Sequence, residues 1–417
     1  MWTSIKSIFA LLLSFGMLLL GNGMFGSLLG IRSRLEAFST LTTGFIMAGF
    51  SVGLLLGALY AVRVVAAVGH IRAFAAFASI MSVAVLAHVL VIEPVIWFVL
   101  RVVAGFCTAG MVMVVESWVN ERATNETRGR ILSLYMMTNY LGAGLGQFML
   151  LTGDPARFQL FIIASMVFSF ALVPILLTRA SAPKPSSPQR MKFRALFAIS
   201  PVGVFGTICA GMTNSSLNSM GAVFAKEIGL SIGEISTFMA AAILGGMALQ
   251  FPIGRLSDKF DRRTILIAAT LATALAALAV IWATGQTAAI LFVTAAVYGS
   301  VGFTLYPLSA SQVNDLAAPD RLIQVSAGLL IAFGIGASIG PIIAAQSMAL
   351  FGPPGMFMFI IGINGALILF TAIRIIQRRP GEKAKAPFMP LGGVGVSSKQ
   401  LYTAAIVSAE QDEDDAS

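Results

Sequence analysis

Long apolar segments, repeated from one end of the chain to the other, limit this sequence to one class of fold. Twelve such runs lie near positions 6–29, 40–62, 73–92, 95–119, 131–152, 158–179, 194–222, 233–254, 264–283, 287–312, 322–349 and 354–376. A helix needs roughly 20 mostly apolar residues to cross a bilayer. Because lipid offers no partner for backbone polar groups, these runs are expected to be helical. The chain is therefore predicted to be an all-α membrane protein with twelve transmembrane helices.

The composition argues against a soluble fold. Of the 417 residues, 57% are hydrophobic and only 11% are charged, which is too little charge to cover a soluble protein of this size. The net charge of +9 comes largely from basic residues in short segments between the apolar runs. No basic stretch is interleaved with the aromatic residues that stack on bases. The lipid bilayer is therefore an expected partner, and nucleic acid is not.

Basic residues divide unequally between the two sides of the predicted bundle. With the N-terminus in the cytoplasm, 22 Lys and Arg residues fall on the cytoplasmic side, four fall outside, and Arg101 lies within a span. Loops rich in Lys and Arg stay in the cytoplasm. Both termini are therefore expected there, in a plasma membrane and specifically a bacterial inner membrane.

A Pro- and Ser-rich stretch after the sixth run, from Ser181 to Pro188, cannot continue a helix and predicts a linker. The predicted parts are an N-terminal six-helix half (1–179), a cytoplasmic linker (180–193), a C-terminal six-helix half (194–376) and a disordered cytoplasmic tail (377–417). The two halves also carry a weak internal repeat. A shift of 194 residues places Gly105 on Gly299, and a shift of 192 places Asn22 on Asn214. Two parallel repeats imply a substrate site between them, near the middle of the membrane.

The segment after the eighth span carries the most specific motif. It reads Gly254-Arg255-Leu256-Ser257-Asp258-Lys259-Phe260-Asp261-Arg262-Arg263. This closely resembles the G-x-x-x-D-[KR]-x-G-[KR]-[KR] signature of the major facilitator superfamily, with Asp261 at the place of the last glycine. The matching stretch after the second span has Ala66 in the acidic position, so the N-terminal copy is degenerate.

Further stretches support the resemblance. Arg101 to Gly105 is similar to the R-x-x-x-G motif of span four, and Glu121 to Gly129 is similar to the E-x6-R-G signature of the loop after that span. Shorter stretches around Glu116, Tyr135 and Tyr306 resemble the YcaD-like branch. The resemblance covers residues 6–376. It implies a monomeric secondary transporter that moves a small molecule by alternating access.

Two ionisable residues within the fourth span are candidates for substrate binding or coupling, because a charge inside a membrane is costly. Arg101 could bind a substrate anion or serve proton coupling, as the resemblance implies. Alternatively it could reach the outer interface or pair with Glu93. Glu116 lies about 22 Å away along the same helix. It could be a protonation site, or it could form a salt bridge that holds an inner gate.

Polar side chains in the spans expected to line the cavity are further candidates. In the superfamily that the motifs resemble, spans one, four, seven and ten surround the cavity, and the matching residues Asn22 and Asn214 fall in two of them. Such amides could bind a hydroxylated or amphiphilic substrate, or they could join helices by hydrogen bonds. The remaining candidates for binding or coupling are Tyr135, Asn139, Asn218 and Tyr306.

Charged residues of the inner loops predict a cytoplasmic gate. Asp258 is expected to cap the next helix or to pair with an Arg. Any salt bridge of Glu116 would reach Arg63, Arg72 or Arg128. The predicted gate residues are Arg63, Arg72, Glu121 and Arg128 in that half, and Gly254, Asp258, Lys259, Arg262 and Arg263 in the other.

Together these features predict a secondary transporter for a small uncharged or amphipathic solute. It would work by rocker-switch alternating access, as an antiporter or symporter, with proton-coupled efflux as one form. Sugar or metabolite uptake is the alternative transport function. A scaffold or receptor that keeps the fold without transport is the alternative of another class. His70 and His88 have no partner at a catalytic spacing. The chain is therefore not expected to be an enzyme, and neither a cofactor nor a metal is predicted.

Overall fold

The computed structural model describes residues 2–122, 125–177, 191, 193–318 and 321–377. Almost all of the predicted linker and tail therefore lies outside the described residues. The first half contains α1 (Trp2–Leu35), α2 (Thr40–Val68), α3 (His70–Leu90), α4 (Pro94–Arg122), α5 (Asn125–Phe148), η1 (Met149–Thr152), α6 (Gln159–Phe170) and α7 (Leu172–Leu176). The second half contains α8 (Phe193–Ile199), α9 (Pro201–Glu227), α10 (Ile232–Lys259), α11 (Arg262–Ala283), α12 (Ala288–Gly302), α13 (Leu305–Asn314), α14 (Leu322–Phe351) and α15 (Gly355–Gln377).

The helices match the predicted apolar runs closely, and the fold is an all-α membrane fold. Within the described residues, ten helical segments are long and apolar enough to cross a membrane, and eleven if the bent pair α8 and α9 counts as one span. The place of the remaining expected span is taken by α5. Its 24 residues include the buried polar side chains of Tyr135, Asn139 and Gln147. These polar residues lower the hydropathy of α5. The membrane fold tolerates them because they face the protein interior rather than lipid.

The predicted run 194–222 is not one straight helix, and this corrects the sequence expectation. Helices α8 and α9 meet at an angle of 114°. Pro201 has no N–H with which to continue a helix. Ser200 caps the new helix because its hydroxyl accepts a hydrogen bond from the Gly203 N–H at 3.2 Å.

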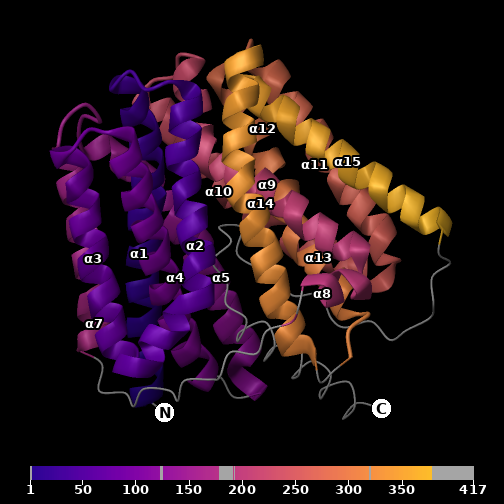
Figure 1. Cartoon of the computed structure of the whole chain (residues 1–417), viewed down its shortest axis with the longest axis horizontal. Helices are drawn as coiled ribbons and strands as arrows, with labels where there is room; N and C mark the ends of the chain where they lie inside the picture. The colour runs from indigo at the N-terminus through magenta and orange to yellow at the C-terminus, as the bar shows by residue number, and fades with distance from the viewer. Residues whose placement is uncertain (1, 123–124, 178–190, 192, 319–320, 378–417) are drawn as a thin grey trace.

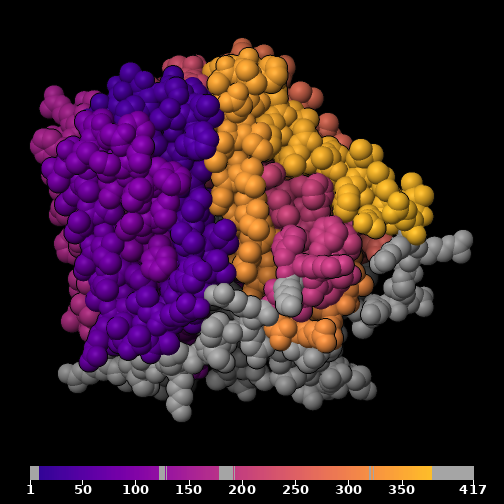
Figure 2. Space-filling view, in the orientation of Figure 1, coloured from indigo at the N-terminus to yellow at the C-terminus, as the bar shows by residue number. Residues whose placement is uncertain are grey.

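The two halves lie side by side (Figure 1), and their helices pack in a repeated pattern. Helix α2 packs on α4 in the first half, and α10 packs on α12 in the second. The halves meet where α2 lies against α14, α5 against α10, and α1 against α9. In the space-filling view, the first half abuts the orange surface of α14 (Figure 2).

We call the side predicted to be cytoplasmic the inner side, and the opposite one the outer side. At the outer ends of the helices, Arg34 of α1 pairs with Glu227 of α9 at 3.2 Å. The Thr40 hydroxyl, at the start of α2, donates to the same carboxylate at 2.9 Å. Nearby, Gly44 of α2 allows close approach to α14, because a Cβ at this position would lie 2.9 Å from the Pro341 carbonyl oxygen. The halves are thus held together on the outer side.

Candidate functional site

A cavity lies between the two halves and has walls from both. Its lining comes from α1, α2, α4 and α5 of the first half and from α9, α10 and α14 of the second. The space not filled by atoms, including part that is open to solvent, is about 830 Å³.

Arg101 lines this cavity from α4. Only 4% of its surface is exposed. Its guanidinium lies 4.5 Å from the centre of the Phe50 ring and 5.8 Å from that of Phe25. Its Nε has no hydrogen-bond partner, and no carboxylate forms an ion pair with it among the described residues. Glu93 instead accepts a hydrogen bond from the Ile96 N–H at the start of α4.

Three of the predicted amides also line the cavity, from opposite walls. Asn22 lies on α1, whereas Asn214 and Asn218 lie on α9. The Thr108 hydroxyl donates a long hydrogen bond of 3.5 Å to the Oδ1 of Asn22, and the Nδ2 of Asn22 has no partner. The structure thus brings the repeat-related pair Asn22 and Asn214 to the same cavity as Arg101.

Glu116 is fully buried nearer the inner end of α4. The Tyr135 hydroxyl of α5 donates a hydrogen bond of 2.5 Å to its Oε1. The Tyr135 ring in turn stacks on Phe15 of α1, with ring centres 4.5 Å apart. One partner of this carboxylate is therefore a neutral hydroxyl of α5, which sequence reasoning did not predict.

Two of the three arginines considered as partners of Glu116, Arg63 and Arg72, lie elsewhere. In the described part of the chain, Arg63 and Arg72 are exposed and form no ion pair with Glu116. Arg63 lies over the ring of Tyr60, 5.3 Å from its centre. Arg128 belongs to the first turn of α5, and its side chain lies outside the described residues.

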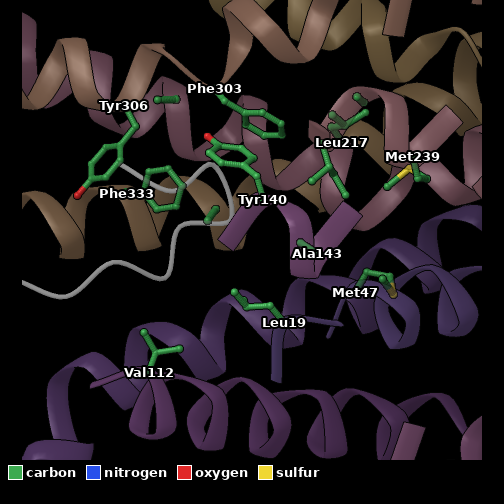
Figure 3. Packing of buried hydrophobic residues seen from close by; sticks show 14 of the residues in the cluster. Leu19, Met47, Val112, Tyr140, Ala143, Leu217, Met239, Phe303, Tyr306 and Phe333 are labelled. Atoms are coloured by element: carbon green, nitrogen blue, oxygen red, sulfur yellow. The ribbon is translucent and has the colours of Figure 1, made fainter. Parts of the chain in front are cut away.

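The last two polar candidates, Asn139 and Tyr306, are buried but do not line the cavity. Neither amide atom of Asn139 has a hydrogen-bond partner. Tyr306 packs on Phe333, which does line the cavity, with ring centres 4.7 Å apart. Close by, the Gln250 amide donates to the Tyr140 hydroxyl and joins α10 to α5. Figure 3 shows these aromatic side chains gathered where the two halves meet.

Arg262 organises the inner end of the second half. It is almost fully buried and pairs with Asp315 at 2.5 Å and with Asp258 at 3.2 Å. It also donates to the Ser257 hydroxyl at 3.2 Å. Asp258 therefore pairs with an arginine, and the cap of α11 is supplied instead by the carboxylate of Asp261.

The first half has a different set of residues at the equivalent positions. The shifts of 192 and 194 residues place Ala66 on Asp258, His70 on Arg262 and Glu121 on Asp315. His70 is buried, whereas Glu121 is exposed. The remaining predicted gate residues are Gly254, which is buried in α10, Lys259, which is exposed at its end, and Arg263, which is half-buried at the start of α11.

Comparison with known proteins assigns the family. The profile of the Major Facilitator Superfamily matches residues 11–202 and again residues 203–409. The chain belongs to this superfamily. As a major facilitator, it is a membrane-embedded transporter, and members of the superfamily are generally not enzymes.

Relatives of this major facilitator agree with the assignment. It is 26% identical over 387 residues to the MFS-type transporter YcaD of Shigella flexneri, covering 92% of this chain and 99% of the relative. Its fold is similar to that of the nucleoside transporter NupG, with a TM-score of 0.72, 13% identity and coverage of 91% and 100%. It is also similar to a bacterial homologue of the human lysosomal transporter Spinster, in an inward-facing and unoccupied conformation. There the TM-score is 0.67, with 16% identity and coverage of 98% and 96%. At these identities the structural likeness extends to the fold alone.

Sequence reasoning missed several residues that the structure brings together in this major facilitator. Asp315 could have been found, because the shift of 194 residues places Glu121 on it. The outer pair of Arg34 and Glu227 had no such signal. These two residues come from different halves, and only the packing of α1 against α9 makes them neighbours.

Proposed function

We propose that this protein is a secondary active transporter that moves a small polar solute by alternating access. The observation that carries the proposal is the cavity lined by both halves, beneath an outer side where the halves are held together. A site between two repeats is exposed to one side and then the other as the halves rock. In this view the structure is closed toward the outside, with both termini in the cytoplasm of a bacterial cell.

The proposal is tested by locking the outer side. In a background in which Cys107 and Cys209 are replaced by Ser, Arg34→Cys and Glu227→Cys are joined by a short thiol-cleavable cross-linker. Liposomes containing this protein should lose solute flux on cross-linking and regain it when a reductant cleaves the link. Single-cysteine variants serve as controls. Flux that persists through complete cross-linking would contradict alternating access.

The scaffold alternative predicts a different result from the same liposomes. A non-transporting protein would show no flux of any solute in a broad metabolite panel, before or after cross-linking. The direction of transport follows from comparing right-side-out with inside-out vesicles, which separates efflux from sugar or metabolite uptake.

We further propose that Glu116 couples transport to protons. Glu116 is fully buried, and the Tyr135 hydroxyl donates a hydrogen bond to its carboxylate. A carboxylate buried in this way is costly to keep charged, so its protonation can follow the access of water as the halves move. Glu116→Gln removes the titratable group and keeps the shape. We expect it to abolish uptake driven by a proton gradient while leaving solute exchange at equal pH. Tyr135→Phe is the matched variant that keeps the carboxylate and should retain partial gradient-driven uptake.

Gradient-driven uptake by Glu116→Gln at the rate of the unmodified protein would refute this role. Loss of both uptake and exchange, together with a lower melting temperature of Glu116→Gln, would instead show that Glu116 stabilises the contact between α4 and α5. An unchanged melting temperature would argue against this structural role.

A further inference from the structure

Arg101 places a positive charge in the cavity, and no described residue supplies a counter-charge. A buried ionised group is stabilised when it is paired and costs free energy when it is not. The Phe25 and Phe50 rings stabilise the charge through their faces. A ring face does not, however, accept the hydrogen bonds that a guanidinium donates in its own plane. The unpartnered Nε of Arg101 shows that this need is unmet.

A second unmet donor belongs to the same cavity. The Nδ2 of Asn22 has no partner, whereas its Oδ1 is already used by Thr108. The unmet groups of Arg101 and Asn22 are thus both donors. No Asp or Glu is among the described residues that line the cavity. A ligand that satisfies the site would therefore bring acceptor oxygens and a negative charge.

The opposite wall calls for different chemistry. Asn214 and Asn218 on α9 offer amide groups, and Met239 and Phe333 add apolar surface beside them. This side carries no charge, so it suits the uncharged part of a small molecule.

We propose that the transported solute is a small organic monoanion whose carboxylate binds at Arg101 and Asn22. Its uncharged part lies against the amides and apolar side chains of the second half. A planar carboxylate can accept two hydrogen bonds from one guanidinium, and one arginine balances one negative charge. That the anion is transported rests on the proposed function, whereas its binding at Arg101 and Asn22 rests on the cavity alone. Of the two kinds of solute expected from the sequence, uncharged or amphipathic, the inference selects the amphipathic one and adds a negative charge.

The test compares acids with their neutral amides on the purified full-length protein. The probes are benzoate, phenylacetate, lactate and N-acetylalanine, each with its amide, in thermal-shift titrations at neutral pH. A ligand that binds the native state raises its melting temperature with concentration. We expect at least one acid to stabilise the protein more than its amide does. Losing hydrogen bonds to a charged group should weaken that acid roughly 10- to 100-fold in Arg101→Gln.

Two variants complete the test. Asn22→Asp is close to isosteric and puts a fixed carboxylate into the cavity, so it should weaken acid binding and spare amide binding. Arg157→Gln removes an exposed arginine outside the cavity and should leave the acid preference unchanged. The inference is overturned if no acid in the panel is preferred over its amide, or if Arg101→Gln keeps the preference. Should Arg101→Gln fail to fold, an undiminished preference in Asn22→Asp overturns it.

Flux assays with the same probes separate this inference from the transport proposal. Acid-selective binding without flux would refute transport and leave the binding site standing. Equal flux of an acid and its amide would support transport and refute the anionic site.

Discussion

Two glycines at equivalent helix crossings test how the helices pack within each half. Gly105 of α4 faces α2, and Gly299 of α12 faces α10. A Cβ on Gly105 would lie 2.8 Å from the Leu54 backbone nitrogen and still closer to the Phe50 carbonyl oxygen. A Cβ on Gly299 would lie 2.7 Å from the Ala242 carbonyl carbon and still closer to its oxygen. Both substitutions to Ala therefore drive a methyl group into the backbone of a neighbouring helix.

The expected loss follows from these distances. Carbon atoms in contact are about 3.5–4.0 Å apart. Because the carbonyl oxygens lie closer still, each helix pair must separate by more than about 1 Å to admit the methyl group. Membrane helices gain stability from the close approach that small residues allow. Overpacking costs about 1–3 kcal/mol, and a backbone neighbour cannot rotate away, so we expect about 3 kcal/mol for each variant. For a cooperative unit the size of one half, this corresponds to a melting temperature lowered by roughly 6–12 °C.

The assay is size-exclusion chromatography of detergent-purified protein after heating, followed by its intrinsic fluorescence. The matched control is Gly362→Ala, because a Cβ on Gly362 of α15 meets nothing within 4 Å. The control should melt at or slightly above the temperature of the unmodified protein, since alanine is the better helix former. The packing argument fails if Gly105→Ala and Gly299→Ala melt no lower than this control.

The outer and inner ion pairs give two further predictions. Arg34→Glu places two acids together at the outer side and should shift the protein toward an outward-open state, as read by faster labelling of a cysteine at Thr40. The double swap with Glu227→Arg should restore slow labelling, and equal labelling in all three proteins would count against an outer latch. At the inner side, Arg262→Gln leaves the largely buried Asp315 carboxylate without its arginine. This should destabilise the protein by up to about 3–5 kcal/mol, and by less where water screens the charge. Adding Asp315→Asn should recover part of that loss, and strictly additive losses in melting temperature would show that the two residues do not interact.

Hydropathy alone identified the class of this protein, because it is a local property of each segment. The predicted runs coincide with the helices to within a few residues at most ends. The exceptions are instructive. Pro201 lies within the predicted run 194–222, and hydropathy does not detect the bend there because the residues on both sides are apolar. In α5 the polar residues were counted within a span, and the structure shows that they face the interior.

The sequence also determined part of the site. The repeat placed Asn22 and Asn214 in matching spans, and the structure finds both in one cavity. Because a charge within a membrane is costly, the sequence alone made Arg101 and Glu116 candidates for substrate binding or coupling. Only the tertiary structure decided their surroundings. Arg101 lines the cavity with no Asp or Glu among the described lining residues, and Glu116 accepts a hydrogen bond from Tyr135. The physical reason is that hydropathy and spacing depend on residues close along the chain, whereas a side chain's partner depends on the crossing and rotation of helices far apart in sequence.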